Sequence, residues 1–244
     1  MGDLPPALTL EDFDGIIIHY SVVMARDNYL SPDARARIRA YTGFKAAFIQ
    51  DEYRLINRTV AMLDYMGIDA LFSVVPYPEC LKLYPPERLP SLRVYTALTG
   101  YVNRDLIGRT TPSFADRAVD VGYRARRLGP DLGLEGQQKW QIAEDFADAV
   151  EGTSLRCDLA FGEEDRFLGE TWYEFIANCR AMLGAESRIS VADYSGRISA
   201  NVQRHARVEP DSSFDSVHAR YVARHEGNIL SLIHISEPTR LTSI

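Results

Sequence analysis

The chain has 244 residues, 46% of them hydrophobic and 25% charged, a composition typical of globular proteins with enough apolar material for a sizeable core. Its net charge of −7 gives no electrostatic case for nucleic acid, because nucleic-acid binders concentrate Lys and Arg. Residues 1–10 contain no signal peptide, and no apolar run is long enough to span a bilayer. We therefore expect a cytoplasmic protein without a transmembrane segment.

Short apolar runs along the chain predict β-strands. Several of them are apolar at successive positions, as expected of strands that are covered on both faces in a parallel sheet. The predicted strands are residues 15–19 (GIIIH), 46–50 (AAFIQ), 70–75 (ALFSVV), 93–98 (RVYTAL), 119–123 (VDVGY), 155–161 (LRCDLAF) and 181–183 (AML).

Helical patterns alternate with these strands. Ser31 followed by Pro32 predicts a helix start, since serine is a favoured N-cap and proline suits the first helical turn. The pattern in residues 169–182 is the strongest, with apolar side chains spaced by three and four. Further helices are predicted at residues 54–66 before Gly67, 137–150, and 212–226 before Gly227.

The alternation of strands and helices predicts an α/β fold with a mostly parallel sheet. Residues 108–117 lack periodicity and are interpreted as a linker between two Rossmann-like, doubly wound domains, residues 1–112 and 113–229. Both domains are expected to be incomplete, because a strand follows closely on Met1 and the second domain stops after one late helix. For residues 116–229 we expect an unpaired sheet edge and an uncovered apolar sheet face.

Residues 230–244 need a separate interpretation. Their LSLIHISEPTR string resembles the conceptual translation of a sequencing adapter, and it does not continue the helix predicted before Gly227. We interpret this tail as non-native sequence. The alternative is an ordinary C-terminal strand and tail.

Ligands of open parallel sheets bind beyond the carboxyl ends of the strands, so polar residues there are the candidates for chemistry. In the first half these are His19, Asp51 and Glu52, and either carboxylate is a candidate general base. The alternative for Asp51 and Glu52 is that they begin a helix, whose N-terminus favours acidic side chains. The alternative for His19 is a hydrogen-bonded, half-buried histidine.

In the second half, the segment GYRAR and the segment LGAES each follow a predicted strand. Gly122 would allow close backbone approach, and Arg124 and Arg126 offer the forked donors that match phosphate oxygens. Glu186, next to Ser187, is a candidate acceptor for a sugar or ribose hydroxyl. The alternatives are a solvated basic loop and a carboxylate that caps the next turn.

Several common motifs are missing. The chain has no G-x-G-x-x-G after a strand, no Walker A loop and no G-x-S-x-G elbow, which removes support for dinucleotide, P-loop and α/β-hydrolase chemistry. The three cysteines are not in a metal-binding spacing, and no His/Cys/carboxylate cluster indicates a metal. We expect neither a metal nor another cofactor.

A series of short motifs resembles bacterial glycosyltransferases of the GT-B fold, including those grouped with CgeB-type and surface-polysaccharide enzymes. The series covers most of residues 13–228, although each motif alone is only moderately specific. The motifs are FDGIIIHYS (13–21), FIQDEY (48–53), LTGYV (98–102), DVGYRARRL (120–128), EEDR (163–166) and CRAMLGAES (179–187).

The resemblance implies two domains that face a cleft, a nucleotide-sugar donor held mainly by the second domain, and a glycan or small-molecule acceptor. It implies catalysis without a bound metal, with cationic side chains stabilising the departing diphosphate. Arg124 and Arg126 match the family's G-Y-R-x-R segment, and Glu186 matches the acidic position of its L-G-x-E-S segment. Residues 225–227 (HEG) are not followed by the family's S-P-R-x-F-E-A-type motif, so we expect an inactive fragment.

Two other functions remain open. One is a sugar-nucleotide epimerase of GT-B-like fold, which would act on the donor without an acceptor. The other is a non-catalytic α/β binding or interaction protein, in which replacing Arg124 or Arg126 would change nothing.

Overall fold

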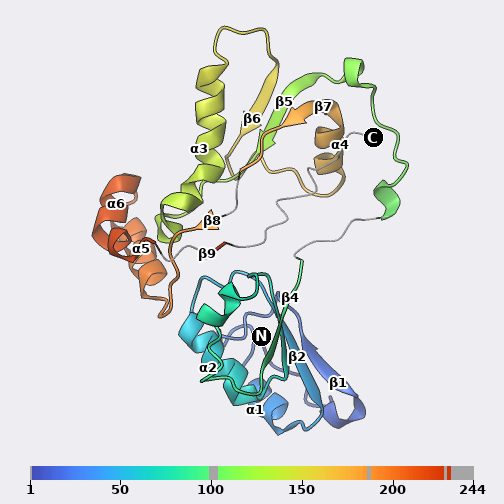
Figure 1. Cartoon of the computed structure of the whole chain (residues 1–244), viewed down its shortest axis with the longest axis vertical. Coiled ribbons are helices and arrows are strands. Elements are labelled where there is room, and N and C mark those ends of the chain that lie inside the picture. Colours follow the sequence, from blue (N-terminus) through green and yellow to red (C-terminus); the bar gives the residue numbers. More distant parts are fainter. Residues whose placement is uncertain (1, 99–103, 186–187, 228–229, 232–244) are drawn as a thin grey trace.

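Figure 1 shows the computed structural model of the chain, which describes residues 2–98, 104–185, 188–227 and 230–231. The described part is a mixed α/β structure with two separate parallel sheets and one short antiparallel pair. This confirms the predicted α/β class with mostly parallel, Rossmann-like sheets. The two parallel sheets fall on either side of the predicted linker; the domain boundary itself stays a prediction.

The first sheet has the order β1-β2-β3-β4, with all neighbours parallel. Its strands are β1 (Gly15–Ile18), β2 (Phe44–Ile49), β3 (Ala70–Ser73) and β4 (Arg93–Thr96). Two helices, α1 (Pro32–Ala40) and α2 (Ile56–Met66), connect β1 to β2 and β2 to β3. Each strand is added on the same side of the preceding one, so the chain never reverses direction across this sheet.

The core of the first sheet lies on one face. Ile18, Ala47 and Leu71 are in register across three strands, and they pack in one buried cluster with residues such as Ile38 and Val60 from the two helices. The helices also contact each other. Because equal-handed crossovers in one direction put every helix on the same side, α1 and α2 share this face.

The second sheet has the order β6-β5-β7 and is also parallel. Its strands are β5 (Val119–Arg124), β6 (Cys157–Ala160) and β7 (Cys179–Met182), and its helices are α3 (Gly133–Ala149) and α4 (Glu170–Asn178). The chain steps from β5 to β6 in one direction and then crosses back to the other side of β5 for β7. Direction reverses at this point.

Reversal places a helix on each face of the second sheet. The Tyr123 hydroxyl donates to the backbone carbonyl of Lys139 on α3, whereas Phe175 of α4 lies against Gly122, on the opposite face. Figure 1 shows α3 and α4 on the two sides of the sheet. The uncovered apolar face that we expected in residues 116–229 is therefore found instead on the first sheet, as described below.

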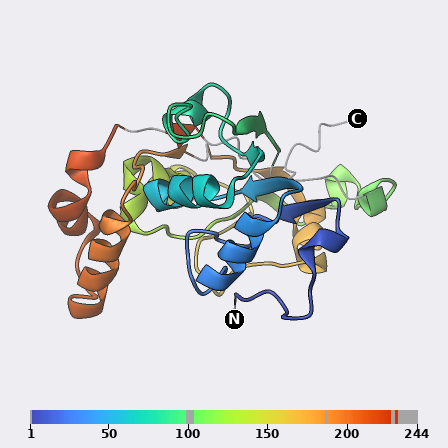
Figure 2. The ribbon, with the colours of Figure 1, turned by 90° about the horizontal axis from the view of Figure 1, so that it is seen from below.

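The C-terminal part adds β8 (Arg188–Ile189), α5 (Arg197–Val208), α6 (Phe214–Tyr221) and β9 (Leu230–Ser231), with β8 and β9 antiparallel. Figures 1 and 2 show α5 and α6 together at one end of the molecule, away from residues 104–116 at the other. Leu230 and Ser231, which we assigned to the tail, thus form a two-residue strand. Six 3₁₀ turns complete the described part: η1 (Leu10–Asp12), η2 (Glu79–Lys82), η3 (Arg104–Leu106), η4 (Phe114–Asp116), η5 (Pro130–Leu132) and η6 (Ala223–His225).

Two of the predicted helices end four or more residues earlier than expected. The helix predicted at residues 169–182 ends at Asn178, and Cys179 begins β7, since the central strand β5 needs a partner there. The helix predicted at residues 212–226 ends at Tyr221 and is followed by η6. Helix α5 was not predicted.

The two halves meet where the segment after β8 packs against the start of α2. The Asp193 amide donates to the Tyr53 carbonyl at 2.8 Å, and the Asn57 amide donates to the Tyr194 carbonyl at 3.0 Å. Ile189 also belongs to the buried cluster of the first sheet. The loop between β2 and α2 is therefore held from both halves of the chain.

Candidate functional site

A cavity of 370 Å³, which we call the first cavity, lies at the carboxyl ends of β1 and β2. It is lined by the loop after β1, by the loop between β2 and α2, and by the first turn of α2. Aromatic and aliphatic side chains form much of its wall, and the polar groups come mainly from residues 50–54. This is the position where open parallel sheets bind ligands.

Glu52 anchors the loop beneath this cavity. Its buried carboxyl accepts hydrogen bonds from the Ser73 hydroxyl (2.8 Å) and the Tyr84 hydroxyl (2.7 Å), and from the amides of Val74 (3.1 Å) and Val75 (3.2 Å). Burial raises the pKa of Glu52, although these hydrogen bonds oppose the shift. Because four donors already occupy the two oxygens, we assign Glu52 to holding the loop and not to proton transfer.

Asp51, by contrast, is exposed and lines the first cavity. Its backbone is in the left-handed region at φ 59°, which residues other than glycine rarely adopt. Burial, with the nearby Asp51 carboxylate, raises the pKa of Tyr53 to about 12. Of the two predicted base candidates, Asp51 is the carboxylate that remains accessible.

The loop is strained at a second position. Leu55 has φ 54°, and a non-glycine residue in the left-handed region costs about 1–3 kcal/mol. Leu55 packs closely on Gly196, where an added Cβ would lie 2.3 Å from Leu55 Cδ2. Contact with the second half of the chain thus fixes a conformation that the loop would not adopt alone, and strain of this kind concentrates at functional sites.

Arg54 links the first cavity to the second half of the chain. Its guanidinium lies 3.7 Å from the Asp131 carboxylate of η5 and 5.0 Å from the centre of the Tyr53 ring. Its Nε is buried and has no hydrogen-bond partner in the described part of the chain. The Arg54 side chain also lines the first cavity and places a cationic group there. Arg54 and Asp131 were not predicted from the sequence, because nothing in their local patterns distinguishes them from ordinary charged residues.

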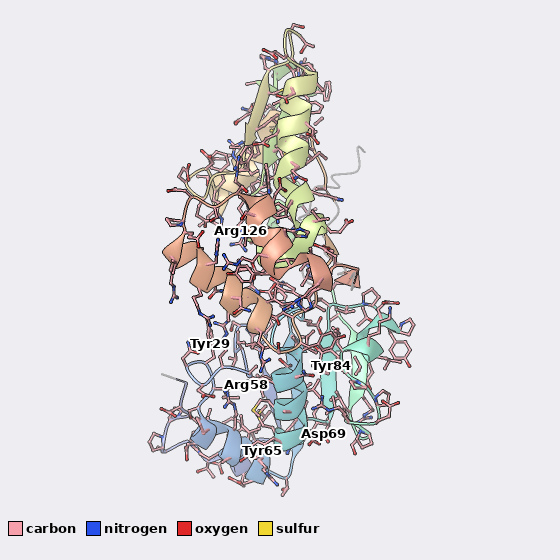
Figure 3. All side chains as sticks on the ribbon, turned by 90° about the vertical axis from the view of Figure 1, so that its left-hand side faces the viewer. Tyr29, Arg58, Tyr65, Asp69, Tyr84 and Arg126 are labelled. Atoms are coloured by element: carbon pink, nitrogen blue, oxygen red, sulfur yellow. The ribbon has the colours of Figure 1, made fainter. Side chains whose placement is uncertain are left out.

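A second cavity, of 560 Å³, lies at the carboxyl ends of β5 and β6. Arg126 is exposed on its wall and forms no ion pair with any described residue. Arg127 is held in place: its guanidinium lies 4.5 Å from the Trp140 ring and 5.0 Å from the Phe161 ring, and it pairs with Glu144. Figure 3 shows Arg126 above Tyr29, a residue of the first cavity, in the left half of the view.

Three acidic residues, Glu163, Glu164 and Asp165, line the same cavity. The carboxylates of Glu164 and Asp165 fold over Gly162, since a Cβ there would lie 2.5 Å and 2.6 Å from their oxygens. The second cavity thus combines forked cationic donors with carboxylate acceptors. The cationic donors can bind phosphate oxygens, and the carboxylates can accept hydrogen bonds from sugar hydroxyls.

Arg124 does not share the position of Arg126. It lies between the rings of Phe167 (4.6 Å) and Phe175 (4.4 Å) and pairs with Asp158 at 2.8 Å, so that its side chain is only 11% exposed. β5 ends at Arg124, so Arg126 lies beyond the strand and the alternation of strand side chains does not set its direction. The structure assigns Arg124 to the packing of α4 on the sheet.

Gly122 has a packing role as well. An added Cβ would lie 2.4 Å from Cys179 Sγ and 2.9 Å from Phe175 Cζ. The absent side chain is thus required by the contact of β5 with β7 and α4. We expected Gly122 to allow backbone approach to a ligand, and the structure gives a different reason for this glycine.

Two predicted residues, Glu186 and Ser187, lie outside the described residues. The strand that precedes them, β7, is next to β5, and the Leu183 amide donates to the Gly122 carbonyl at 3.1 Å. β5 and β7 are also the pair at which the strand order reverses, which is the preferred ligand position of such sheets. His19 is exposed; its Nδ1 lies 2.9 Å from Ser21 Oγ, and its ring lies against Tyr20.

Within the described ranges, no group of three or more His, Cys, Asp or Glu side chains is placed to hold a metal ion. No described helix has the length and apolar character needed to cross a membrane. No family model, curated protein or solved structure matches the chain.

Proposed function

We propose that this chain carries the donor and acceptor sites of a glycosyltransferase of the GT-B type, with a nucleotide sugar in the second cavity. The observation that carries the proposal is the composition of that cavity at the carboxyl ends of β5 and β6. Arg126 is exposed on the cavity wall and offers donors for a diphosphate, and the carboxylates of Glu164 and Asp165 on the same wall offer acceptors for hydroxyl groups, while Glu163 pairs with Arg166. The series of sequence motifs that resembles this enzyme class supports the same function.

In the proposed reaction, the acceptor occupies the first cavity. Asp51 takes the proton of an acceptor hydroxyl as the acceptor oxygen forms a bond to the anomeric carbon. The bond from that carbon to the nucleotide diphosphate breaks, and the diphosphate leaves with the electron pair. Arg126 stabilises the developing negative charge in the role that a metal takes in other enzymes.

Binding of the donor is tested by titrating UDP-, GDP- and CMP-linked sugars into the purified chain and following heat release. We expect Arg126→Ala to weaken the best ligand roughly 10- to 100-fold, the loss of one charge-assisted contact. Arg207→Ala, an exposed arginine on α5, is the matched control and should bind as the wild type does. If Arg126→Ala and the wild type bind the nucleotide sugar with equal affinity, Arg126 does not contact the diphosphate.

Turnover is tested with the same donors and a panel of glycan and lipid-linked acceptors. Asp51→Asn should lower kcat roughly 100-fold or more and leave donor affinity unchanged, because a general base acts after binding. Donor hydrolysis or epimerisation without an acceptor would support the epimerase instead. Donor binding with no reaction by the wild type would agree with the inactivity expected from the missing S-P-R-x-F-E-A-type motif. The non-catalytic protein would then be distinguished by Arg126→Ala, which should change nothing in that protein.

A further inference from the structure

One face of the first sheet is apolar and is not covered by any described element. Its side chains are Ile17, Phe44, Phe48, Phe72 and Tyr95, which we call the aromatic face. Ile17 is 69% exposed, Phe44 47% and Tyr95 44%, while Phe48 and Phe72 are half-buried. The rings of Phe48, Phe72 and Tyr95 stack across three strands, with centroids 4.5 Å and 5.4 Å apart.

Topology explains why this face is bare. Every described crossover of the first sheet steps in the same direction, so α1 and α2 both pack on the opposite face. Parallel sheets occur almost only with both faces covered, as the second sheet of this chain shows. The aromatic face therefore has the character of an interface.

Its size fits the apolar part of a standard interface. An aromatic side chain buries about 150–250 Å² when fully covered, so five side chains at these exposures leave about 400 Å² of apolar surface open. A stable interface of standard size buries about 800 Å² per partner, of which roughly 450–520 Å² is non-polar. The aromatic face thus supplies most of the apolar area that a dimer needs.

Charge permits an identical partner. Apart from Arg93 at the β4 border, the positions of β1 to β4 that point to this face are uncharged. A two-fold axis along the strands would place β4 of one copy over β1 of the other, where Gly15 and Ile17 carry no charge. The two Arg93 side chains then lie at opposite corners and do not meet.

We propose that the aromatic face is the interface between two copies of this chain, which pack face to face about a two-fold axis. The two sheets form a sandwich, with the stacked rings of one copy against those of the other. This inference does not depend on the proposed function, because of the five residues of the aromatic face only Phe48 also lines a cavity.

The experiment measures the mass of the purified full chain in solution by light scattering during size exclusion, at protein concentrations up to about 100 µM. The wild type should show twice the 27.5 kDa mass of one chain. The double variant Ile17→Lys/Tyr95→Lys should run as a monomer, because each new charge would be buried in the dimer. Both positions are exposed, so its circular dichroism and unfolding midpoint should stay close to those of the wild type.

The control is Ile107→Lys/Leu168→Lys, at apolar positions that are 74% and 71% exposed and lie outside the aromatic face. This variant should remain dimeric. A monomeric wild type, a wild type that forms only undefined aggregates, or equal dimerisation by both double variants would overturn the proposal. A stoichiometric complex with a different polypeptide in place of the dimer would also overturn it.

Discussion

The two parallel sheets of this chain are built from similar strand–helix units but are covered differently. In the first sheet the chain keeps one direction and leaves one face open, whereas in the second it reverses at β5 and covers both. The number of helices is the same in each, so the order of the strands decides the coverage. The two sheets also depend on different kinds of residue for their packing.

In the first sheet, with a core on one face only, a buried carboxyl ties the strand ends together. Glu52 reaches from the end of β2 to the end of β3 and to the segment after η2. In the second sheet, with two covered faces, close packing around the central strand matters most, and Gly122 is the position that permits it. Three substitutions test how individual residues of the two halves contribute to stability.

The largest effect is expected for Glu52→Ala. The substitution leaves two hydroxyls and two backbone amides without their acceptor. Each buried donor without a hydrogen bond lowers the stability by about 1–3 kcal/mol, and water that enters the site partly offsets this loss. We expect a loss of about 3 kcal/mol or more in the free energy of unfolding, measured by urea denaturation. The neighbouring Asp51→Asn is the control and should change stability by less than about 0.5 kcal/mol. Similar losses for both variants would contradict the anchoring role.

An intermediate effect is expected for Gly122→Ala. The new methyl group would overlap Cys179 and Phe175, and overpacking of this kind costs about 1–3 kcal/mol. Gly184→Ala is the matched control, because no atom lies within 4 Å of its added Cβ. Thermal unfolding should show a lowered midpoint for Gly122→Ala alone. A neutral result at Gly122 would mean that α4 does not pack on β5 as described.

The smallest effect is expected for Glu226→Gln. Glu226 follows η6, and its side chain contacts the N-terminus of α3. The Glu226 carboxylate accepts a hydrogen bond from the Leu134 amide at 3.0 Å and lies 2.7 Å from His218 Nε2. Partial burial acts to raise the pKa of Glu226, but hydrogen bonds from Ser190, His218 and Leu134 outweigh it and lower the pKa below 4.5. Loss of the negative charge at this helix N-terminus should cost about 0.5–1 kcal/mol at neutral pH.

The lowered pKa of Glu226 also predicts how the effect of Glu226→Gln on stability changes with pH. A lowered pKa in the folded state means that the stabilisation by Glu226 is fully present above pH 4.5 and is lost as the pH falls through the folded-state value. The difference in unfolding free energy between wild type and Glu226→Gln should therefore shrink as the pH drops below 4.5. The exposed Glu151→Gln should show no such difference. A difference that grows in acid would refute the capping contact.

Local signals in the sequence predicted local structure well. The Ser31 hydroxyl accepts a hydrogen bond from the Ala34 amide at 3.1 Å, which confirms the N-cap, and Gly67 ends α2 with φ 64°. These features depend on neighbours within a few residues, so their patterns carry the information. At Cys179 the same reasoning failed, because the apolar helical pattern continues where pairing with β5 instead requires a strand.

The site could be predicted only in part. The sequence placed Asp51, Glu52 and Arg126 at strand ends, since strand ends follow from the apolar runs. It gave no means to tell Asp51 from Glu52, because their difference arises from donors 21 to 32 residues away, at Ser73 and Tyr84. Nor did it indicate Arg54 and Asp131, which meet only when the two halves pack together.

The sequence by itself thus determined the α/β class, the strands of the two parallel sheets and most of the helices, because hydrophobic periodicity and capping are local properties of the chain. Tertiary structure alone decided the strand order of the two sheets, and with it which sheet has an open apolar face. It also decided which of the charged residues at the strand ends stay accessible. These outcomes depend on contacts between segments far apart in the chain, and no local pattern encodes them.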